Sequence, residues 1–190
     1  MAYIRTFVAI DLDASVRGRT AELVRRWQDL EARINWVERE NMHLTLKFLG
    51  DIEDRRVPEV CSAVQQAAAA HRPFEVQCQG VGAFPAVERA RTIWIGVEQS
   101  QGALAALSED VDEALHAVGY PMESRRYHGH LTIGRVRDPC GQRDEIRRRI
   151  EAAADFQAGS SLVNQVVVYS SVLERRGPQY GVLSRVRLKS

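Results

Sequence analysis

Two tetrapeptides of one type carry the residues in this chain that are best suited to chemistry. They are His43-Leu44-Thr45-Leu46 and His130-Leu131-Thr132-Ile133. Successive side chains of a β-strand point to opposite faces, so each tetrapeptide as a strand has His and Thr on one face and apolar residues on the other. Two such strands side by side would gather two imidazoles and two hydroxyls above a buried apolar layer.

Phosphate chemistry suits this set of groups. An imidazole has an unperturbed pKa of about 6.5, so it can give or take a proton near neutral pH. With one histidine on each side of a phosphate, one can act as base and the other as acid in an in-line displacement at phosphorus. Thr45 and Thr132 would donate hydroxyl hydrogen bonds to the charged non-bridging oxygens. The scheme requires no metal, and we expect no cofactor.

Simpler interpretations of the histidines exist. A single histidine in an apolar strand is more often a structural residue held by a hydrogen bond. A metal site would need a further ligand nearby. Only His128, two residues before His130 on the same strand face, is suitably placed, and Cys61, Cys78 and Cys140 match no zinc pattern. Two His-x-Thr pairs in one chain favour the catalytic interpretation, with no metal ligands.

The elements around the motifs form a repeat. In the first half we expect a strand over residues 3–12, a helix over 13–33, a short strand over 35–37 and the first motif strand over 42–49. The second half repeats this order with a strand over 91–96, a helix over 102–118 and the second motif. Arg5-Thr6 and Arg91-Thr92 open the two strands at nearly the same distance before each histidine. This recurrence indicates an internal duplication.

The remaining segments complete the expected fold. They are helices over 54–70 and 143–153, a strand over 74–79 with a glycine-containing loop over 80–85, and strands over 164–173 and 180–188 joined by a turn at Gly177-Pro178. The short turns favour antiparallel pairing. We therefore expect one bilobal α+β domain over residues 1–190: two pseudo-symmetric lobes, each a mainly antiparallel sheet with helices on its outer face, and an active site in the central cleft.

Composition limits the partners. The formal net charge is only +1, so no strong overall field attracts nucleic acid, and 45% hydrophobic residues suffice for a sizeable core. Local arginine clusters at 25–26, 125–126, 147–149 and 175–176 either contact nucleic acid or form solvated faces beside acidic residues. No apolar run is long enough for a signal peptide or a membrane span. We expect a cytoplasmic monomer that does not contact membranes.

The motifs and their flanks resemble the 2H phosphoesterase superfamily, and more narrowly the RNA 2′,3′-cyclic phosphodiesterases of bacteria and archaea, also called 2′-5′ RNA ligases. The matching segments span nearly the whole chain: residues 5–10, 40–50, 84–85, 94–96, 130–135, 169–173 and 177–180. Gly129 stands where the family usually has proline before the second histidine, a change that removes no reactive group.

The resemblance implies an activity and two roles. The activity is hydrolysis of a 2′,3′-cyclic phosphate to a 2′-phosphomonoester, with His43 as proton donor to the leaving 3′ oxygen and His130 as proton acceptor from water. The reverse reaction would join a 5′-hydroxyl to the cyclic phosphate as a 2′-5′ linkage. The implied partners are RNA with a 2′,3′-cyclic phosphate end, such as a tRNA half, or a nucleoside 2′,3′-cyclic phosphate. From the residues alone, the similarity of the two motifs leaves the acid and base roles open.

Three further residues are predicted to bind substrate. Arg135, five residues after His130, matches a family position near the nucleotide and would pair with phosphate or stack on a base; the alternative is an exposed strand-end arginine. Arg125 matches a family arginine ahead of the second motif. Phe7 offers either a stacking face or a core side chain. Tyr169 and Tyr180 match the family pattern and line the cleft or pack beneath it.

Two other functions remain open. One is a cyclic phosphodiesterase of a small nucleotide, mildly favoured by the near-neutral charge. The other is a non-catalytic module that binds nucleotides or RNA ends, against which the intact His and Thr pairs argue.

Overall fold

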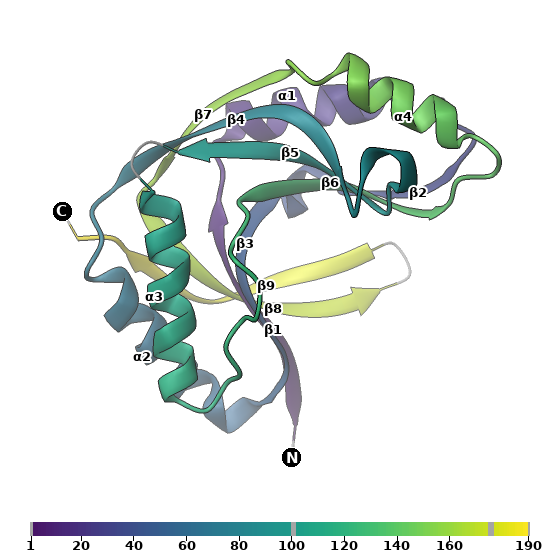
Figure 1. Ribbon diagram of the computed structural model, residues 1–190. Helices are drawn as coiled ribbons and strands as arrows, with labels where there is room; N and C mark the ends of the chain where they lie inside the picture. The colour runs from purple at the N-terminus through teal and green to yellow at the C-terminus, as the bar shows by residue number, and fades with distance from the viewer. Residues whose placement is uncertain (1, 100–101, 175–176, 190) are drawn as a thin grey trace.

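The structure is a computed structural model that describes residues 2–99, 102–174 and 177–189. Figure 1 shows how the elements follow one another. The strands are β1 (Tyr3–Asp11), β2 (Arg33–Trp36), β3 (His43–Glu53), β4 (Phe74–Phe84), β5 (Thr92–Gln99), β6 (His130–Asp138), β7 (Gln157–Val163), β8 (Gln165–Glu174) and β9 (Gly177–Arg187). The helices are α1 (Ala14–Arg26), α2 (Val57–Ala68), α3 (Ala103–Ala117) and α4 (Arg143–Ala152), with short 3-10 turns η1 (Arg39–Asn41), η2 (Asp54–Arg56) and η3 (Val87–Arg89).

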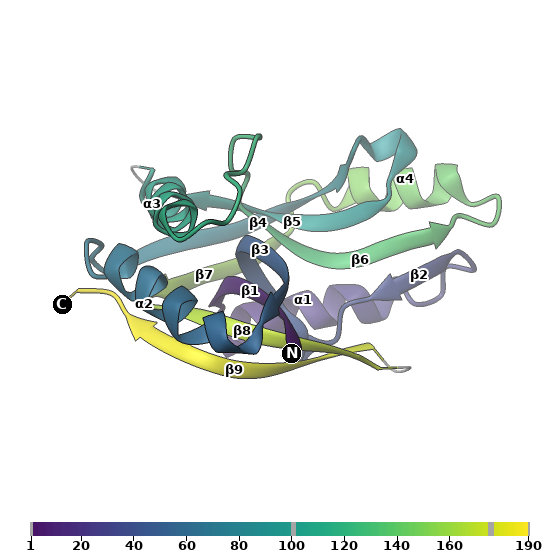
Figure 2. The ribbon, with the colours of Figure 1, turned by 90° about the horizontal axis from the view of Figure 1, so that it is seen from below.

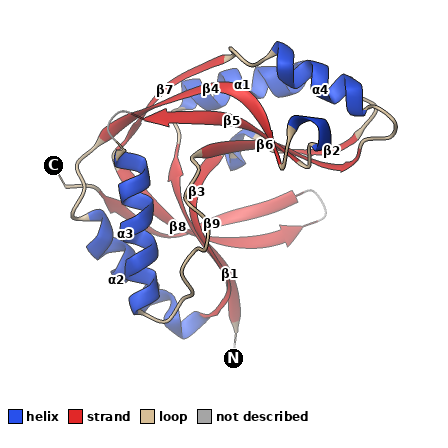
Figure 3. Ribbon diagram, in the orientation of Figure 1, coloured by secondary structure: helices blue, strands red, loops and turns tan. Residues whose placement is uncertain are grey.

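One antiparallel sheet runs through both halves of the molecule. Its order is β7-β4-β5-β6-β3-β1-β8-β9, and β2 also pairs with β6. The two motif strands, β3 and β6, are neighbours at its centre and pair through Leu44 and Leu131. The sheet therefore divides into a first lobe, β3-β1-β8-β9, and a second lobe, β6-β5-β4-β7. Figure 3 shows this curved sheet in red, with the helices in blue set against it. The predicted bilobal α+β fold is confirmed.

The helices pack in two pairs, one for each lobe. Helices α2 and α3 contact each other and cover the first lobe, where α2 packs on β8 and β9 and α3 on β3. Helices α1 and α4 lie on the second lobe, α1 against β7 and α4 against β4. Figures 1 and 2 show the two pairs at separate ends of the sheet. Helix α1 joins strands of the first repeat but covers the second lobe, and α3 joins strands of the second repeat but covers the first lobe. These crossings tie the two halves together.

The core fills the space between the sheet and the helices. Three of the four apolar residues of the motifs, Leu44, Leu131 and Ile133, are 0% exposed, and the fourth, Leu46, is 5% exposed. Burial of a side chain of this size contributes about 1.5–3 kcal/mol. The apolar face of each motif strand is thus fixed in the core, and its other face is left for the histidine and threonine.

The predicted loop over residues 80–85 is wrong, because β4 continues through it to Phe84. Gly80 has φ +68° at an irregularity in the pairing with β5, and a Cβ on Gly82 would lie 2.3 Å from the Trp94 ring. These glycines serve a bulge and a close approach of an aromatic ring, which glycine inside a strand also permits. The glycine-containing segment is therefore a strand with special packing.

The C-terminal region differs from the sequence prediction at two places. Strand β7 was not predicted, because its small and polar residues give a weak strand pattern. Gly177 and Pro178 lie within β9, opposite Glu174 and Leu173, so they do not form the turn. The connection between β8 and β9 falls at 175–176, outside the described residues, as does the predicted arginine cluster there.

Helix α1 ends earlier than predicted, at Arg26, with Trp27 as its C-terminal cap. Asp13 precedes the helix as expected, but its side chain does not cap it. The Asp13 carboxylate instead accepts a hydrogen bond from the Leu162 backbone N–H at 3.2 Å. Asp13 thereby fastens the start of α1 to β7. None of the helices in the described part of the chain has the length and apolarity needed to span a bilayer.

Candidate active site

The two motifs lie side by side on β3 and β6. Leu44 and Leu131 are direct partners in the antiparallel ladder. Continuing that register by one residue each way places His43 across from Thr132 and Thr45 across from His130. Directly opposed residues of antiparallel strands project from the same face, with Cβ atoms about 4.5–5.5 Å apart. The fold therefore gathers all four predicted catalytic residues in one array, opposite the buried leucines.

A β-bulge follows each motif at the equivalent position. On β3, Leu46 has no partner in the ladder with β1, and on β6, Ile133 has none in the ladder with β5. Each bulge keeps two successive residues buried and changes the alternation of the side chains beyond it. As a result Phe48 and Arg135, each five residues after its histidine, are exposed and line the cleft.

Both histidines are anchored in the same way. The Nδ1 atom of His43 lies 2.7 Å from the Asn41 carbonyl oxygen, and Nδ1 of His130 lies 2.8 Å from the His128 carbonyl oxygen. A carbonyl only accepts, so each Nδ1 carries the proton and donates it. In the neutral imidazole Nε2 is then the acceptor, ready to take a proton. In the imidazolium, Nε2 is the donor. Each ring is therefore oriented for proton transfer through Nε2.

The cleft reaches the two motifs unequally. A cavity of about 1990 Å³ is lined by Thr45, His130 and Thr132 among others, but not by His43. His43 lies one hydrogen bond behind the wall, with Nε2 3.1 Å from the Thr45 hydroxyl oxygen. In the neutral state the Thr45 hydroxyl donates to this nitrogen. A phosphate held by Thr45 would therefore be next to His43.

Aromatic rings surround each imidazole. The ring centroid of His43 lies 4.9 Å from that of Phe7 and 5.4 Å from that of Tyr180. On the other side, the ring of His130 lies 5.1 Å from Phe84 at an interplanar angle of 86°. These contacts hold the imidazoles in place and exclude water from one side of each ring.

The charges around the two histidines differ. Burial lowers the pKa of His43 below its ordinary value, the Asn41 carbonyl and the Asp11 carboxylate oppose this shift, and the Arg135 guanidinium adds to it. Burial also lowers the pKa of His130, where the His128 carbonyl opposes the shift and the His128 and Arg135 side chains add to it. Arg135 thus acts on both imidazoles, whereas a carboxylate acts on His43.

The predicted substrate-binding residues fall into different places. Arg125 and Arg135 are exposed and line the cleft. Phe7 is only 2% exposed and packs against the rings of His43 and Tyr169, with centroid distances of 4.9 and 5.3 Å. Its ring has no free face for a base, so the core role fits the structure and the stacking role does not.

No metal-ligand cluster accompanies His128. Among the described residues no group of three or more His, Cys, Asp or Glu side chains is gathered as a set of metal ligands. The His128 ring instead lies 5.5 Å from Trp94 and 5.6 Å from Phe84. It belongs to the aromatic surroundings of His130.

Sequence reasoning missed three contributors to the site. Asp11 lies opposite His43 in the ladder of β1 with β3. Lys47 is 3% exposed and binds Asp112 and the Pro121 carbonyl oxygen, the latter at 2.6 Å. The Tyr127 hydroxyl donates to the Thr45 carbonyl at 3.2 Å. Of these, Lys47 had a signal in the sequence, its position directly after the first motif.

A two-lobed antiparallel α+β fold that presents one His-x-Thr pair from each of two central strands is the architecture of a 2H phosphoesterase. The sequence profile described as LigT like phosphoesterase matches residues 10–94 and again 95–180, and the chain belongs to that family. The two matches agree with the internal duplication predicted from the repeated motifs.

Individual relatives extend over the whole chain. A Methanothermobacter thermautotrophicus protein named RNA 2′,3′-cyclic phosphodiesterase is 32% identical over 97% of this chain and 99% of its own. The crystal structure of E. coli LigT complexed with 3′-AMP matches with a TM-score of 0.74 and 26% identity, covering 99% of both chains. The crystal structure of a Thermus thermophilus protein, TT0787, has the same fold, with a TM-score of 0.81 at 23% identity and 98% coverage of both chains.

Proposed function

We propose that this protein hydrolyses 2′,3′-cyclic phosphodiesters of RNA or nucleotides to 2′-phosphomonoesters by two-histidine acid–base catalysis without a metal. The observation that carries the proposal is the opposed register of the two His-x-Thr pairs, with both imidazoles anchored through Nδ1. The names of relatives that match nearly full length support the substrate class. Residues 1–190 would act as one bilobal domain.

In the proposed reaction His130 accepts a proton at Nε2 from a water molecule, whose oxygen attacks phosphorus. The bond from phosphorus to the 3′ oxygen breaks, and His43 gives that oxygen the proton on its own Nε2. Thr45 and Thr132 donate hydrogen bonds to the non-bridging oxygens, where charge builds up. The proton then passes from His130 to His43 through solvent, which restores the enzyme.

The surroundings of the histidines support this division of roles. The acid must start protonated, and the Asp11 carboxylate favours the imidazolium form of His43. The base must start neutral, and the His128 side chain disfavours the imidazolium form of His130. Arg135 disfavours the imidazolium form of both histidines and does not distinguish them. The reverse reaction, with a 5′-hydroxyl in place of water, would form a 2′-5′ linkage. Hydrolysis should dominate unless the two RNA ends are held together.

Steady-state hydrolysis of a nucleoside 2′,3′-cyclic phosphate, measured with and without EDTA, tests the proposal. We expect turnover that EDTA does not change. Each of His43→Ala and His130→Ala should lower kcat by about 10²–10⁴-fold, the usual contribution of a positioned acid or base. His116→Ala, on an exposed histidine of α3, is the matched control and should behave as wild type.

Circular dichroism of all three variants shows whether the fold is intact. Near-wild-type kcat in either motif variant would refute the paired acid–base scheme, and loss of activity in EDTA would refute the metal-free one.

A further inference from the structure

The cleft is larger than one nucleotide requires. Its volume of about 1990 Å³ exceeds the roughly 300–1,000 Å³ of ordinary small-molecule pockets. Among the residues that the structure describes, seven arginines line it. Arg125 and Arg126 come from the loop before β6, and Arg135 lies beside the motifs. The other four form what we call the arginine track: Arg89, Arg91, Arg137 and Arg143.

The arginine track is contributed by elements of the second lobe. Arg89 ends η3, Arg91 precedes β5, Arg137 is on β6 and Arg143 begins α4. The backbone holds them together, since the Val136 N–H donates to the Arg91 carbonyl oxygen at 2.9 Å. All four are exposed, and in the part of the chain that the structure describes none of their side chains makes a hydrogen bond or ion pair.

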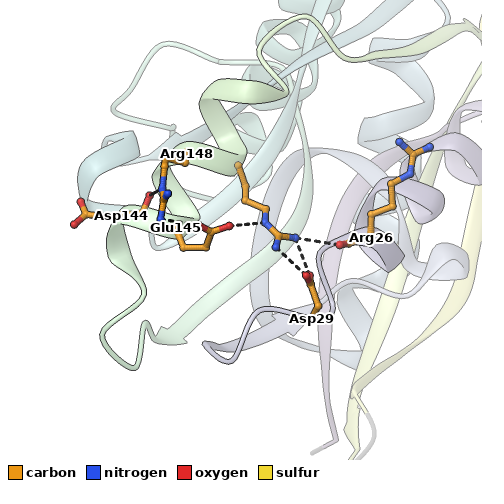
Figure 4. A network of polar contacts seen from close by, with 6 residues as sticks. Arg26, Asp29, Asp144, Glu145 and Arg148 are labelled. Carbon is orange, nitrogen blue, oxygen red and sulfur yellow. Dashed lines mark hydrogen bonds and ion pairs between the residues drawn. The ribbon is translucent and has the colours of Figure 1, made fainter.

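The later arginines of α4, outside the cleft, are different, because they are paired with acidic side chains. Figure 4 shows this for α4, where a guanidinium lies between Asp29 and Glu145. It belongs to Arg149, whose nitrogens lie 2.7 and 2.8 Å from the Asp29 carboxylate oxygens. Arg148, on the same helix, lies 2.8 Å from Glu145. Unpaired arginines are thus a property of the cleft side of α4 and not of the helix as a whole.

The pseudo-symmetry of the molecule supplies an internal comparison. Beyond its bulge, β6 places Arg135 and Arg137 in the cleft wall, two positions apart and so about 6.6–7 Å along the strand. The corresponding residues of β3, counted from His43, are Phe48 and Gly50. Only the second-lobe strand therefore carries a line of positive charge leading away from the motifs.

Acidic residues in the cleft wall are unevenly distributed. Glu109, Asp112 and Glu113 belong to α3 and Glu123 to the loop after it, near Arg125 and Arg126. On the side of the arginine track, Glu88 is the only acidic residue in the described part of the chain that lines the cleft. The excess positive charge is therefore concentrated on the second lobe.

We propose that the arginine track binds the backbone phosphates of an RNA strand on the 5′ side of its cyclic end, which makes an oligonucleotide the preferred substrate. The inference rests on the proposed function. When a terminal 2′,3′-cyclic phosphate occupies the motifs, every other phosphate of that strand lies 5′ to it. Arg135 then meets the terminal nucleotide, and the arginine track receives the phosphates that precede it. Guanidinium groups suit this task because they bind phosphate oxygens in pairs.

The first test compares substrates of different length. We expect kcat/KM for a tetranucleotide with a 2′,3′-cyclic end to exceed that for the mononucleoside cyclic phosphate by about tenfold or more, as one or more charged hydrogen bonds to phosphate would provide. Equal kcat/KM values for the tetranucleotide and the mononucleoside cyclic phosphate would refute RNA binding by the arginine track without contradicting the proposed activity. Hydrolysis of neither would instead refute the proposed function.

The second test uses binding and does not depend on turnover. Fluorescence anisotropy of a labelled hexanucleotide should show weaker binding to the Arg137→Gln/Arg143→Gln variant, and a salt dependence lowered by about 0.7 for each phosphate that the variant no longer binds. The control, Arg25→Gln/Arg148→Gln, removes the same charge from arginines paired outside the cleft. Equal weakening in both variants would point to net charge alone and overturn the site. Unchanged RNA binding in the track variant would also overturn it and leave this face for another ligand, such as an acidic protein.

Discussion

The two motif histidines have the same orientation but different neighbours. Each donates from Nδ1 to the carbonyl two residues earlier in the chain. The difference arises from Asp11, which lies across from His43 and is held by the Tyr169 hydroxyl at 2.5 Å and by Arg185 at 2.9 Å. At the scale of single residues, this carboxylate would distinguish the proposed acid, His43, from the proposed base, His130, in a nearly symmetric site.

The pH profile follows from the directions of these shifts. The base must be neutral, so activity rises as pH rises through the pKa of His130. The acid must be protonated, so activity falls as pH rises through the pKa of His43. Both pKa values are lowered. Because kcat/KM reports the free enzyme, its optimum should lie below the ordinary histidine value of about 6.5.

Asp11→Asn sharpens this pH test, because it removes a charge that raises the pKa of His43 and leaves His130 unaffected. The limb of the kcat/KM profile that reports His43 should move to lower pH, and the other limb should stay. Asp138→Asn, on an exposed carboxylate paired with Arg33, is the control. Movement of neither limb, or of both equally, would contradict a specific action of the Asp11 charge on His43.

Single residues also show what the sequence could reveal. His43, Thr45, His130 and Thr132 were predicted because their types and their alternation suit the proposed chemistry. Asp11 could not be, since its importance comes from a neighbouring strand that ends up opposite His43. Cross-strand partners depend on register, which local pattern does not specify.

At the scale of elements, the repeat predicted from the sequence is present but shifted. The alignment of Arg5-Thr6 with Arg91-Thr92 makes Phe7 equivalent to Ile93. In the sheet, however, Phe7 pairs with Phe48. Counted from the motif histidines, Arg135 is the equivalent of Phe48, and its partner in the sheet is Thr92 and not Ile93. The same offset is already present at the histidines, where Asp11 lies opposite His43 and Gly96 lies opposite His130, so the two equivalent bulges do not cause it. The alternation of side chains within each motif was predictable from the sequence. The bulges that place Phe48 and Arg135 in the cleft wall were not.

Lys47 shows how an element next to the motif supports the site. Its buried ammonium binds Asp112 and the Pro121 carbonyl oxygen, and Asp112 also accepts from the Glu123 N–H at 3.0 Å. This tethers the loop that leads to β6 and the second motif. Lys47→Met would leave a mostly buried carboxylate unpaired, and we expect the free energy of unfolding in a denaturant titration to fall by about 3–5 kcal/mol.

The double variant Lys47→Met/Asp112→Leu separates stability from positioning. Replacing both charges by apolar groups should restore most of the unfolding free energy. The loop would still lack its tether, so kcat/KM should remain below that of wild type. Full recovery of kcat/KM along with stability would limit Lys47 to a structural role, and a stable single variant would contradict the buried ion pair.

The whole molecule is a pair of lobes that is symmetric in backbone and asymmetric in charge. Helices α1 and α3 each cross to the other lobe, and β8 and β9 return the C-terminal strands to the first lobe. A hydrophobic pattern predicts that helices cover a sheet but not which lobe they cover, because both lobes offer similar apolar faces. On this symmetric frame, Arg135 and Phe48 occupy equivalent places in the cleft.

That asymmetry predicts the product. With His43 as the acid at the 3′ oxygen, a nucleoside 2′,3′-cyclic phosphate should give the 2′-phosphate alone, which requires the ribose to bind in one of two orientations between nearly equivalent histidines. Arg135 is the charged group that marks one side. Arg135→Gln should therefore yield both 2′- and 3′-phosphates in phosphorus NMR or chromatography, while Arg148→Gln keeps a single product. A pure 3′-phosphate from wild type would reverse the roles of the histidines. An unchanged product in Arg135→Gln would show that another group orients the ribose.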